Sequence, residues 1–256
     1  MSFIDLLIVC ITLFSTPLRG IRLSLCPSLS DHYSQLIGEI TNALSEKYQH
    51  EIIVVDDGST DNTLNVLLNI KQDLSTLRVV KHLTNSGQST AVRTGVQHAK
   101  SAWIATLDGD GQNDPADIPN LYNELINNQG ADPWLVVAGY RKKRKDTWLK
   151  RVSSRCANGI RDSLLRDGTP DTGCGLKVFA RDSFLDLPYF DHMHRYIPAL
   201  FQRQGGRVVS IEVNHRHRIL GTSKYGFHNR LWVGIVDILG VRWLQNRARL
   251  TKIEEL

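Results

Sequence analysis

Short apolar strands alternate with helical segments along the first 140 residues, and this alternation constrains the fold more than any other feature. Four runs are continuous and rich in β-branched or aliphatic residues: EIIVVDD, LRVVKH, AWIATLDGD and PWLVVAGYR. Helical patterns precede or separate them: QLIGEITNALSEKY, TDNTLNVLLNIKQ, STAVRTGVQHAKS and DIPNLYNELINNQ. Strands that are apolar throughout are buried on both faces. We therefore predict an α/β fold whose mostly parallel sheet has helices on both faces.

The pattern is looser after residue 150. Helical segments are predicted at VSSRCANGIRDSLL and MHRYIPALFQRQG, and strands at GLKVFAR and RVVSIEVNHRHR. A long amphipathic helix, GFHNRLWVGIVDILGVRWLQNR, follows. The chain has 256 residues, no internal repeat and no low-complexity linker, so we predict one compact domain with a C-terminal attachment over residues 229–256.

The net charge of +5 is concentrated in two runs, Arg141–Arg151 and His215–Arg218. Such runs indicate an anionic partner such as a phosphate, a lipid surface or a nucleic acid, or else a solvated charged face. Nucleic acid is not expected, because no motif combines aromatic and basic residues for base stacking. The four cysteines form no CxxC pair, which argues against a zinc ribbon or a disulfide framework and favours a cytoplasmic location.

Residues 1–34 are atypical. Their apolar run FIDLLIVCITLF is about 12 residues long, too short for the roughly 20 of an ordinary membrane span. It contains Asp5 and has no basic flank before it, unlike a signal peptide. No first strand is assigned in this segment.

Polar side chains follow the strand that ends at Leu107. Asp108, Asp110 and Gln112 are spaced two apart, so they point the same way where the strand runs into a loop. Converging carboxylate and amide oxygens suit Mg²⁺ or Mn²⁺. The alternative is turn chemistry, since Asp and Gly are the usual residues of turns.

A second strand ends in adjacent carboxylates, Asp56 and Asp57, and Ser59 and Asp61 follow as candidate caps of the next helix. Adjacent like charges have no obvious structural reason. A carboxylate here could accept hydrogen bonds from a base or a ribose. Ligands of open parallel sheets bind at the carboxyl ends of strands, where both pairs of acids are expected.

The motifs VVDDGSTDNT, TNSGQSTAVRTG and LDGDGQNDP resemble those of family 2 glycosyltransferases. The resemblance is to the dolichol-phosphate mannosyltransferase and polyprenyl-phosphate glycosyltransferase branch, and it extends from Gln35 to Arg249. Later motifs agree in order: AGYR, LKRVSSRCAN, DTGCGLKVF, HRYIPAL and HRHRILGTSKYG. The resemblance implies a GT-A fold over residues 35–228 and inverting transfer of a sugar from a GDP-mannose or UDP-hexose type donor to a polyprenyl or dolichyl phosphate. Mg²⁺ or Mn²⁺ is the implied cofactor.

The resemblance also implies roles for individual residues. Base, ribose and nucleotide contacts fall on Asp56, Asp57, Asn85, Gly87 and Asp108, and the metal and diphosphate motif on Asp108, Asp110 and Gln112. Residues near the lipid phosphate are Arg141, Arg151, Ser154, Arg155, Arg218, Ser223 and Lys224, with His194 and Arg195 near the acceptor. The implied catalytic residues are Asp110, Arg155, Arg218 and Lys224.

One motif departs from the family. Its usual opening strand ends in a Pro-x-x-Asn-Glu type signature, whereas the nearest match here is LSLCPSLSDHY, placed about two residues too close to the next helix. Two other functions therefore stay open: a degenerate, non-catalytic family member and a metal-dependent nucleotidyltransferase.

The implied reaction needs no catalytic dyad, because a phosphate monoester is already anionic near neutral pH. Catalysis then rests on neutralising the charge of the phosphates and aligning the two substrates. Two alternating histidine pairs, at residues 192–194 and 215–217, lack the third ligand that a zinc site requires.

The C-terminal helix carries Trp232 and Trp243 with Arg230, Arg242, Arg247 and Arg249. This pattern suits a peripheral position on the cytoplasmic face of a membrane. The alternatives are a helix packed on the core or on a second subunit of a homo-oligomer.

Overall fold

The computed structural model describes residues 7–14, 32–44, 47–130, 132–141, 159, 161–216 and 227–251. In this part of the chain a sheet of seven strands has the order β3-β2-β1-β4-β6-β5-β7. The strands are β1 (Leu7–Phe14), β2 (Gln49–Asp56), β3 (Leu77–Lys81), β4 (Trp103–Asp108), β5 (Val136–Tyr140), β6 (Lys177–Ala180) and β7 (Val208–Glu212).

Most strands of the sheet run in one direction. The pairs β2–β3 and β5–β7 are parallel, and β1 is antiparallel to both β2 and β4. β6 is antiparallel to both β4 and β5. It follows that β2, β3, β4, β5 and β7 share a direction, opposite to that of β1 and β6. The predicted mostly parallel α/β sheet is confirmed.

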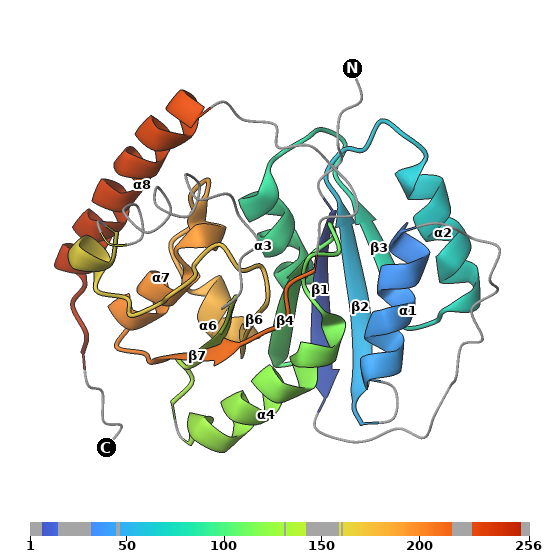
Figure 1. The fold of residues 1–256 in the computed structure, drawn as a ribbon, viewed down its shortest axis with the longest axis horizontal. Helices are drawn as coiled ribbons and strands as arrows, with labels where there is room; N and C mark the ends of the chain where they lie inside the picture. The colour runs from blue at the N-terminus through green and yellow to red at the C-terminus, as the bar shows by residue number, and fades with distance from the viewer. Residues whose placement is uncertain are drawn as a thin grey trace.

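Helices cover both faces of the sheet (Figure 1). They are α1 (His32–Leu44), α2 (Thr63–Asp73), α3 (Gln88–His98), α4 (Ile118–Gln129), α6 (Arg181–Leu185), α7 (Ile197–Arg203) and α8 (Phe227–Arg247), with short 3₁₀ turns η1 (Pro115–Asp117) and η2 (Met193–Arg195). One apolar cluster joins α1, α2 and α4 to the sheet, and a second joins α3, α6, α7 and α8 to its other face.

Strand β2 shows why its sequence is apolar throughout. Ile52 and Val54 belong to the first cluster, and Ile53 and Val55 to the second. Alternate side chains of a strand point to opposite faces, so a strand with a core on each side needs apolar residues at every position.

The apolar N-terminal run forms the interior strand β1, between β2 and β4. Its register pairs Leu7 with Asp56 of β2 and Ile8 with Asp108 of β4. Cys10 and Ile11 are fully buried, in the second and first cluster respectively. The sequence assigned no first strand here, so β1 is a finding of the structure. The division of the chain into units at residues 35 and 229 stays a prediction.

Of the two candidate caps before α2, Asp61 is the one that acts on the helix. Its Oδ1 accepts a hydrogen bond from Thr63 N, the first residue of α2, at 2.8 Å. The N-cap residue itself is Asn62, which makes no side-chain capping hydrogen bond. The N-cap predicted at Asp61 is therefore wrong by one residue, although Asp61 still accepts from the first N–H of the helix.

The C-terminal helix α8 is an outer layer that packs on α7 (Figure 1). Val241 is fully buried, and Arg203 Nε of α7 donates to Leu244 O at 3.0 Å. Among the described helices, none combines the length and apolar character that crossing a membrane requires. The helix predicted at VSSRCANGIRDSLL lies largely outside the described residues, which resume as helix at 161–165.

The position of β1 can be tested at its contact with α3. A Cβ on Gly95 would lie 2.4 Å from Cys10 Sγ and 3.0 Å from Cys10 Cβ. We expect Gly95→Ala to lower the free energy of unfolding by about 1–3 kcal/mol, since overpacking a core forces neighbours to move. Urea denaturation measures this change.

Cys10→Ala should recover part of that loss, because it removes the nearest clashing atom. The matched control is Gly240→Ala on α8, where a Cβ meets no atom within 4 Å and helix propensity favours alanine. A Gly95→Ala effect that is absent or independent of Cys10 would show that β1 does not lie against α3.

Candidate functional site

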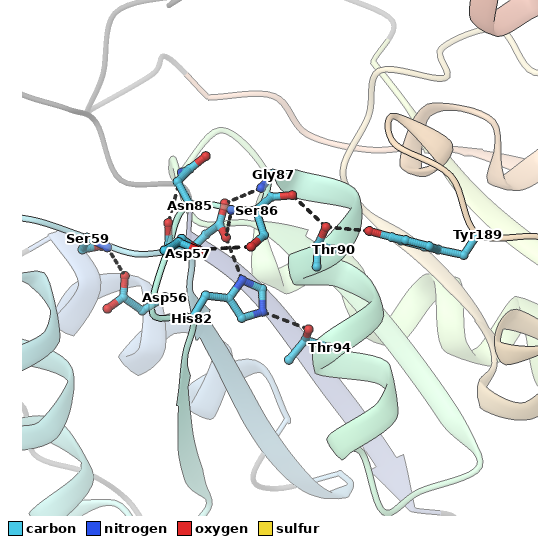
Figure 2. A network of polar contacts seen from close by, with 11 residues as sticks. Asp56, Asp57, Ser59, His82, Asn85, Ser86, Gly87, Thr90, Thr94 and Tyr189 are labelled. Carbon is cyan, nitrogen blue, oxygen red and sulfur yellow. Dashed lines mark hydrogen bonds and ion pairs between the residues drawn. The ribbon is translucent and has the colours of Figure 1, made fainter.

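The carboxylate of Asp57, just after β2, holds the loop that leads into α3 (Figure 2). Asp57 is fully buried. Its Oδ1 accepts from Ser86 N at 2.8 Å and contacts His82 Nδ1 at 2.7 Å, and its Oδ2 accepts from Gly87 N at 2.8 Å. Asn85 Nδ2 donates to the backbone oxygen of Asp57 at 3.0 Å. The predicted nucleotide residues Asp57, Asn85 and Gly87 thus form one hydrogen-bonded unit.

His82 extends this unit to the body of α3. Its Nε2 lies 2.9 Å from Thr94 Oγ1, while its Nδ1 faces Asp57 (Figure 2). His82 was not among the site residues predicted from the sequence, although its place at the end of the strand LRVVKH was a usable signal.

The neighbouring Asp56 is used differently. Its Oδ1 accepts from Ser59 N at 2.9 Å, but its buried Oδ2 has no hydrogen-bond partner among the described residues. A buried acceptor without a donor is costly, so a ligand donor would be favoured there. The two adjacent acids therefore divide into one with both oxygens bonded, Asp57, and one with an oxygen still available, Asp56.

A close approach fixes the spacing of these two loops. Gly58 has a positive φ of 78°, and a Cβ there would lie 2.8 Å from Asn85 N. Only glycine accommodates both the left-handed backbone and this contact.

Asp108 ends β4 and lines a pocket of about 220 Å³. Gln88 Nε2, from α3, donates to Asp108 Oδ1 at 2.9 Å. A Cβ on Gly175 would lie 2.4 Å from the Asp108 carboxyl carbon, so glycine is required beside the carboxylate. Lys177, His194 and Arg195 also line this pocket.

Asp110 and Gln112 lie on the turn that follows β4. Gln112 N donates to Asp110 Oδ1 at 3.0 Å, and Arg216 N donates to Gln112 O at 2.9 Å. His32 of α1 contacts Gly109 O through Nε2 at 3.0 Å. The turn interpretation of this motif is therefore correct, and it does not compete with a ligand role. No cluster of three His, Cys, Asp or Glu suited to a metal occurs in the described residues; the predicted set is two carboxylates and an amide.

Arg141, predicted near the acceptor phosphate, forms a bidentate ion pair. Its Nε lies 2.5 Å from Asp171 Oδ2 and its Nη2 2.8 Å from Oδ1. Burial lowers the pKa of Arg141, but the hydrogen bond and charge of Asp171 outweigh it and raise the pKa overall, with a smaller contribution from Asp108. Arg141 is thus a permanent cation near Asp108.

Lys177 is a buried lysine that was not among the site residues predicted from the sequence. Its Nζ donates to the backbone oxygens of Cys174 and Thr172. Burial lowers its pKa, while Asp108 and Asp171 oppose that effect. A lysine inside the apolar run GLKVF was the available sequence signal.

The other predicted site residues, Arg151, Ser154, Arg155, Arg218, Ser223 and Lys224, lie outside the described residues. Their roles near the lipid phosphate stay predictions. Of the first alternating histidine pair, His192 contacts Asp237 at 3.1 Å and His194 contacts Ser89 at 2.8 Å, so the two rings have separate partners.

Comparisons with known proteins identify the family of the chain. The family model Glycosyl transferase family 2 matches residues 33–187. Dodecaprenyl-phosphate galacturonate synthase of Rhizobium johnstonii is 35% identical over 242 residues, covering 91% of this chain and 70% of that protein. Undecaprenyl-phosphate 4-deoxy-4-formamido-L-arabinose transferase of Edwardsiella ictaluri is 35% identical over 180 residues, covering 70% of this chain and 54% of that protein. The chain therefore spans about half the length of this second relative.

The fold is similar to that of a solved glycosyltransferase. Glucosyl-3-phosphoglycerate synthase from Mycobacterium tuberculosis, in complex with Mn²⁺, UDP and phosphoglyceric acid, superposes with a TM-score of 0.57 at 19% identity. The match covers 86% of this chain and 75% of that one. The predicted GT-A-like fold is confirmed.

The role of Asp57 in anchoring the loop before α3 can be tested by substitution. In Asp57→Asn, one carboxylate oxygen becomes an NH₂ group facing backbone donors. We expect the free energy of unfolding to fall by about 2–3 kcal/mol, because a buried charged acceptor of several hydrogen bonds is lost. Urea denaturation tests this, with the exposed Asp73→Asn on α2 as control, expected within about 0.5 kcal/mol of wild type. Equal stability of the two variants would show that Asp57 does not anchor this loop.

Proposed function

The chain belongs to glycosyl transferase family 2 and is a glycosyltransferase, and from this premise we propose that it transfers a sugar to a polyprenyl phosphate. The donor is a nucleotide-diphosphate sugar of the GDP-mannose or UDP-hexose type. Both relatives compared above are named for transfer to a polyprenyl phosphate, but with different sugars. The proposal therefore names the lipid acceptor class and leaves the sugar to a donor panel.

The observation that carries the proposal is the pairing of two acid sites at one edge of the sheet. Asp56 and Asp108 lie opposite neighbouring residues of β1, Leu7 and Ile8. Asp56 has an acceptor oxygen available for a base or ribose donor. Asp108 borders the pocket. A nucleotide at Asp56 would therefore extend its diphosphate and sugar towards Asp108.

A divalent cation fits the residues after β4. Asp108, Asp110 and Gln112 offer only hard oxygen ligands, the donor set that Mg²⁺ and Mn²⁺ prefer. Such an ion, when bound, would neutralise charge on the departing nucleotide diphosphate. The hydrogen bond from Gln88 fixes the Asp108 carboxylate, and the backbone of Gln112 fixes that of Asp110.

The acceptor phosphate is itself the nucleophile. Its second pKa is about 6, so it is anionic at neutral pH and needs no general base. Its direct attack on the anomeric carbon inverts the sugar. We propose Arg151, Ser154, Arg155, Arg218, Ser223 and Lys224 as its ligands. Arg141, a cation paired with Asp171, is proposed as a further ligand.

We also propose that α8 contacts the membrane from the cytoplasmic side. Its outward residues Val236, Leu239 and Trp243 are 65%, 58% and 58% exposed, although its opposite face is packed against the core. Arg247 lies over the Trp243 ring, with its guanidinium carbon 5.7 Å from the ring centroid. A basic and aromatic outer face on a helix suits the interface of an anionic bilayer, where the lipid acceptor resides.

The metal site is tested by Asp110→Asn. We expect sugar transfer to undecaprenyl phosphate at limiting Mn²⁺ or Mg²⁺ to fall at least about 100-fold, because a charged ligand is lost. The melting temperature should be unchanged. A panel of UDP and GDP sugars provides the donor, and Asp182→Asn, 89% exposed at its side chain, is the matched control.

Full activity of Asp110→Asn would remove the metal assignment. Wild-type protein that transfers nothing from any donor would indicate a degenerate member. Transfer of nucleotide in place of sugar would indicate a nucleotidyltransferase.

The membrane contact is tested by the double variant Leu239→Glu with Trp243→Glu. We expect binding to phosphatidylglycerol vesicles to fall at least about tenfold, since burial of each large apolar side chain contributes about 1.5–3 kcal/mol. Co-sedimentation measures the bound fraction. The matched control is Leu68→Glu with Ile126→Glu, exposed on α2 and α4.

Unchanged vesicle binding would place the contact elsewhere. A change of size on gel filtration without a change in vesicle binding would assign this face of α8 to a second subunit.

A further inference from the structure

A histidine in the Asp108 pocket is held by a serine from a distant helix. His194, in η2, lines the pocket, and its Nδ1 lies 2.8 Å from Ser89 Oγ. Ser89 is fully buried in the first turn of α3. The pair joins residues 105 positions apart in the sequence.

The hydrogen bonds of Ser89 favour one tautomer of the His194 ring. The backbone N–H of His194 donates to Ser89 Oγ at 3.3 Å, so the hydroxyl oxygen already acts as an acceptor. The hydroxyl can also donate its own proton, and His194 Nδ1 is an acceptor within reach. In a neutral imidazole with Nδ1 as acceptor, the proton resides on Nε2.

The surroundings keep the ring neutral. Burial lowers the pKa of His194 well below its usual value, and electrostatic interactions with Arg195, Lys177 and His192 lower it further. Ser89 is uncharged, and Asp108 is the carboxylate on the same pocket wall. Since Nδ1 faces Ser89, Nε2 is the ring nitrogen left to face the pocket as a donor.

We propose that His194 Nε2–H donates a hydrogen bond to a ring or hydroxyl oxygen of the transferred sugar, and that Ser89 is the positioning residue that holds this tautomer. The inference rests on the proposed function. A pocket of about 220 Å³ lies below the range of about 300–1,000 Å³ for small-molecule and cofactor pockets, which suits a monosaccharide better than a whole nucleotide sugar. A neutral donor suits an uncharged sugar oxygen, whereas Arg195 is the cation beside it suited to phosphate.

Two isosteric substitutions separate the two ring nitrogens. The amide nitrogen of glutamine can reach the position of Nε2, and that of asparagine the position of Nδ1. We expect His194→Ala and His194→Asn to lower kcat/KM for the best nucleotide sugar of the panel by about 10- to 100-fold, the effect of a buried hydrogen bond. His194→Gln should retain activity within about tenfold of wild type. The KM for undecaprenyl phosphate and the affinity for the free nucleoside diphosphate, measured by calorimetry, should change less than about threefold.

The positioning role of Ser89 is tested by a double-mutant cycle. Ser89→Ala alone should lower kcat/KM for the donor, but it should add little in the His194→Ala background, because both changes remove the same hydrogen bond. The matched control is His98→Ala, an exposed histidine of α3 outside the site, which should leave activity unchanged. Melting temperatures accompany each variant, and His194→Gln keeps the test open if the alanine variant does not fold.

The outcomes distinguish this inference from the proposed function. A wild-type protein that transfers no sugar would overturn both. With an active wild type, an equal loss of affinity for the free nucleotide would assign His194 to the diphosphate, and a raised KM for the lipid alone would assign it to the acceptor. Wild-type kinetics in His194→Ala would also overturn the inference. So would wild-type kinetics in His194→Asn together with a loss of activity in His194→Gln.

Discussion

The site depends on a buried carboxylate that is compensated by donors from a single loop. Asp57 has no exposed surface, and its oxygens contact Ser86 N, Gly87 N and His82 Nδ1. A buried charge persists only when such donors are fixed around it. The carboxylate therefore selects one conformation of the loop between β3 and α3. That loop in turn sets where α3 begins and where Gln88 and Ser89 meet the pocket.

Around Asp108, charge balance and close packing act together. The acids Asp108 and Asp171 interact electrostatically with the same two basic residues, the partly exposed Arg141 and the buried Lys177. Gly175 leaves room for the Asp108 carboxylate where any Cβ would collide. The segment from Asp171 to Lys177 is held at one end by the ion pair of Asp171 with Arg141. At the other end, Lys177 Nζ donates a hydrogen bond to Thr172 O. This arrangement is suited to a reaction in which negative charge develops on phosphate oxygens, since the groups around it are fixed before substrate binds.

The two faces of α8 have different tasks. On its inner face, Val241 packs in the second apolar cluster. Asp237 of α8 contacts His192, which is two residues from His194. Its outer face keeps large apolar side chains exposed. The helix α8 thus contacts the segment that lines the pocket and also carries the proposed membrane contact. A lipid substrate would arrive at that same surface.

The sequence by itself determined the alternation of elements, the helices on both faces and the acids at the ends of β2 and β4. These features follow from local periodicity and from chain order, so they are readable in single segments. Tertiary structure alone decided that residues 7–14 form an interior strand, antiparallel to both of its neighbours. It also decided that Asp57 is saturated while Asp56 is not, that Arg141 is paired with Asp171, and that Ser89 meets His194. Each of these depends on which distant atoms share a buried space, and local pattern carries no information about that.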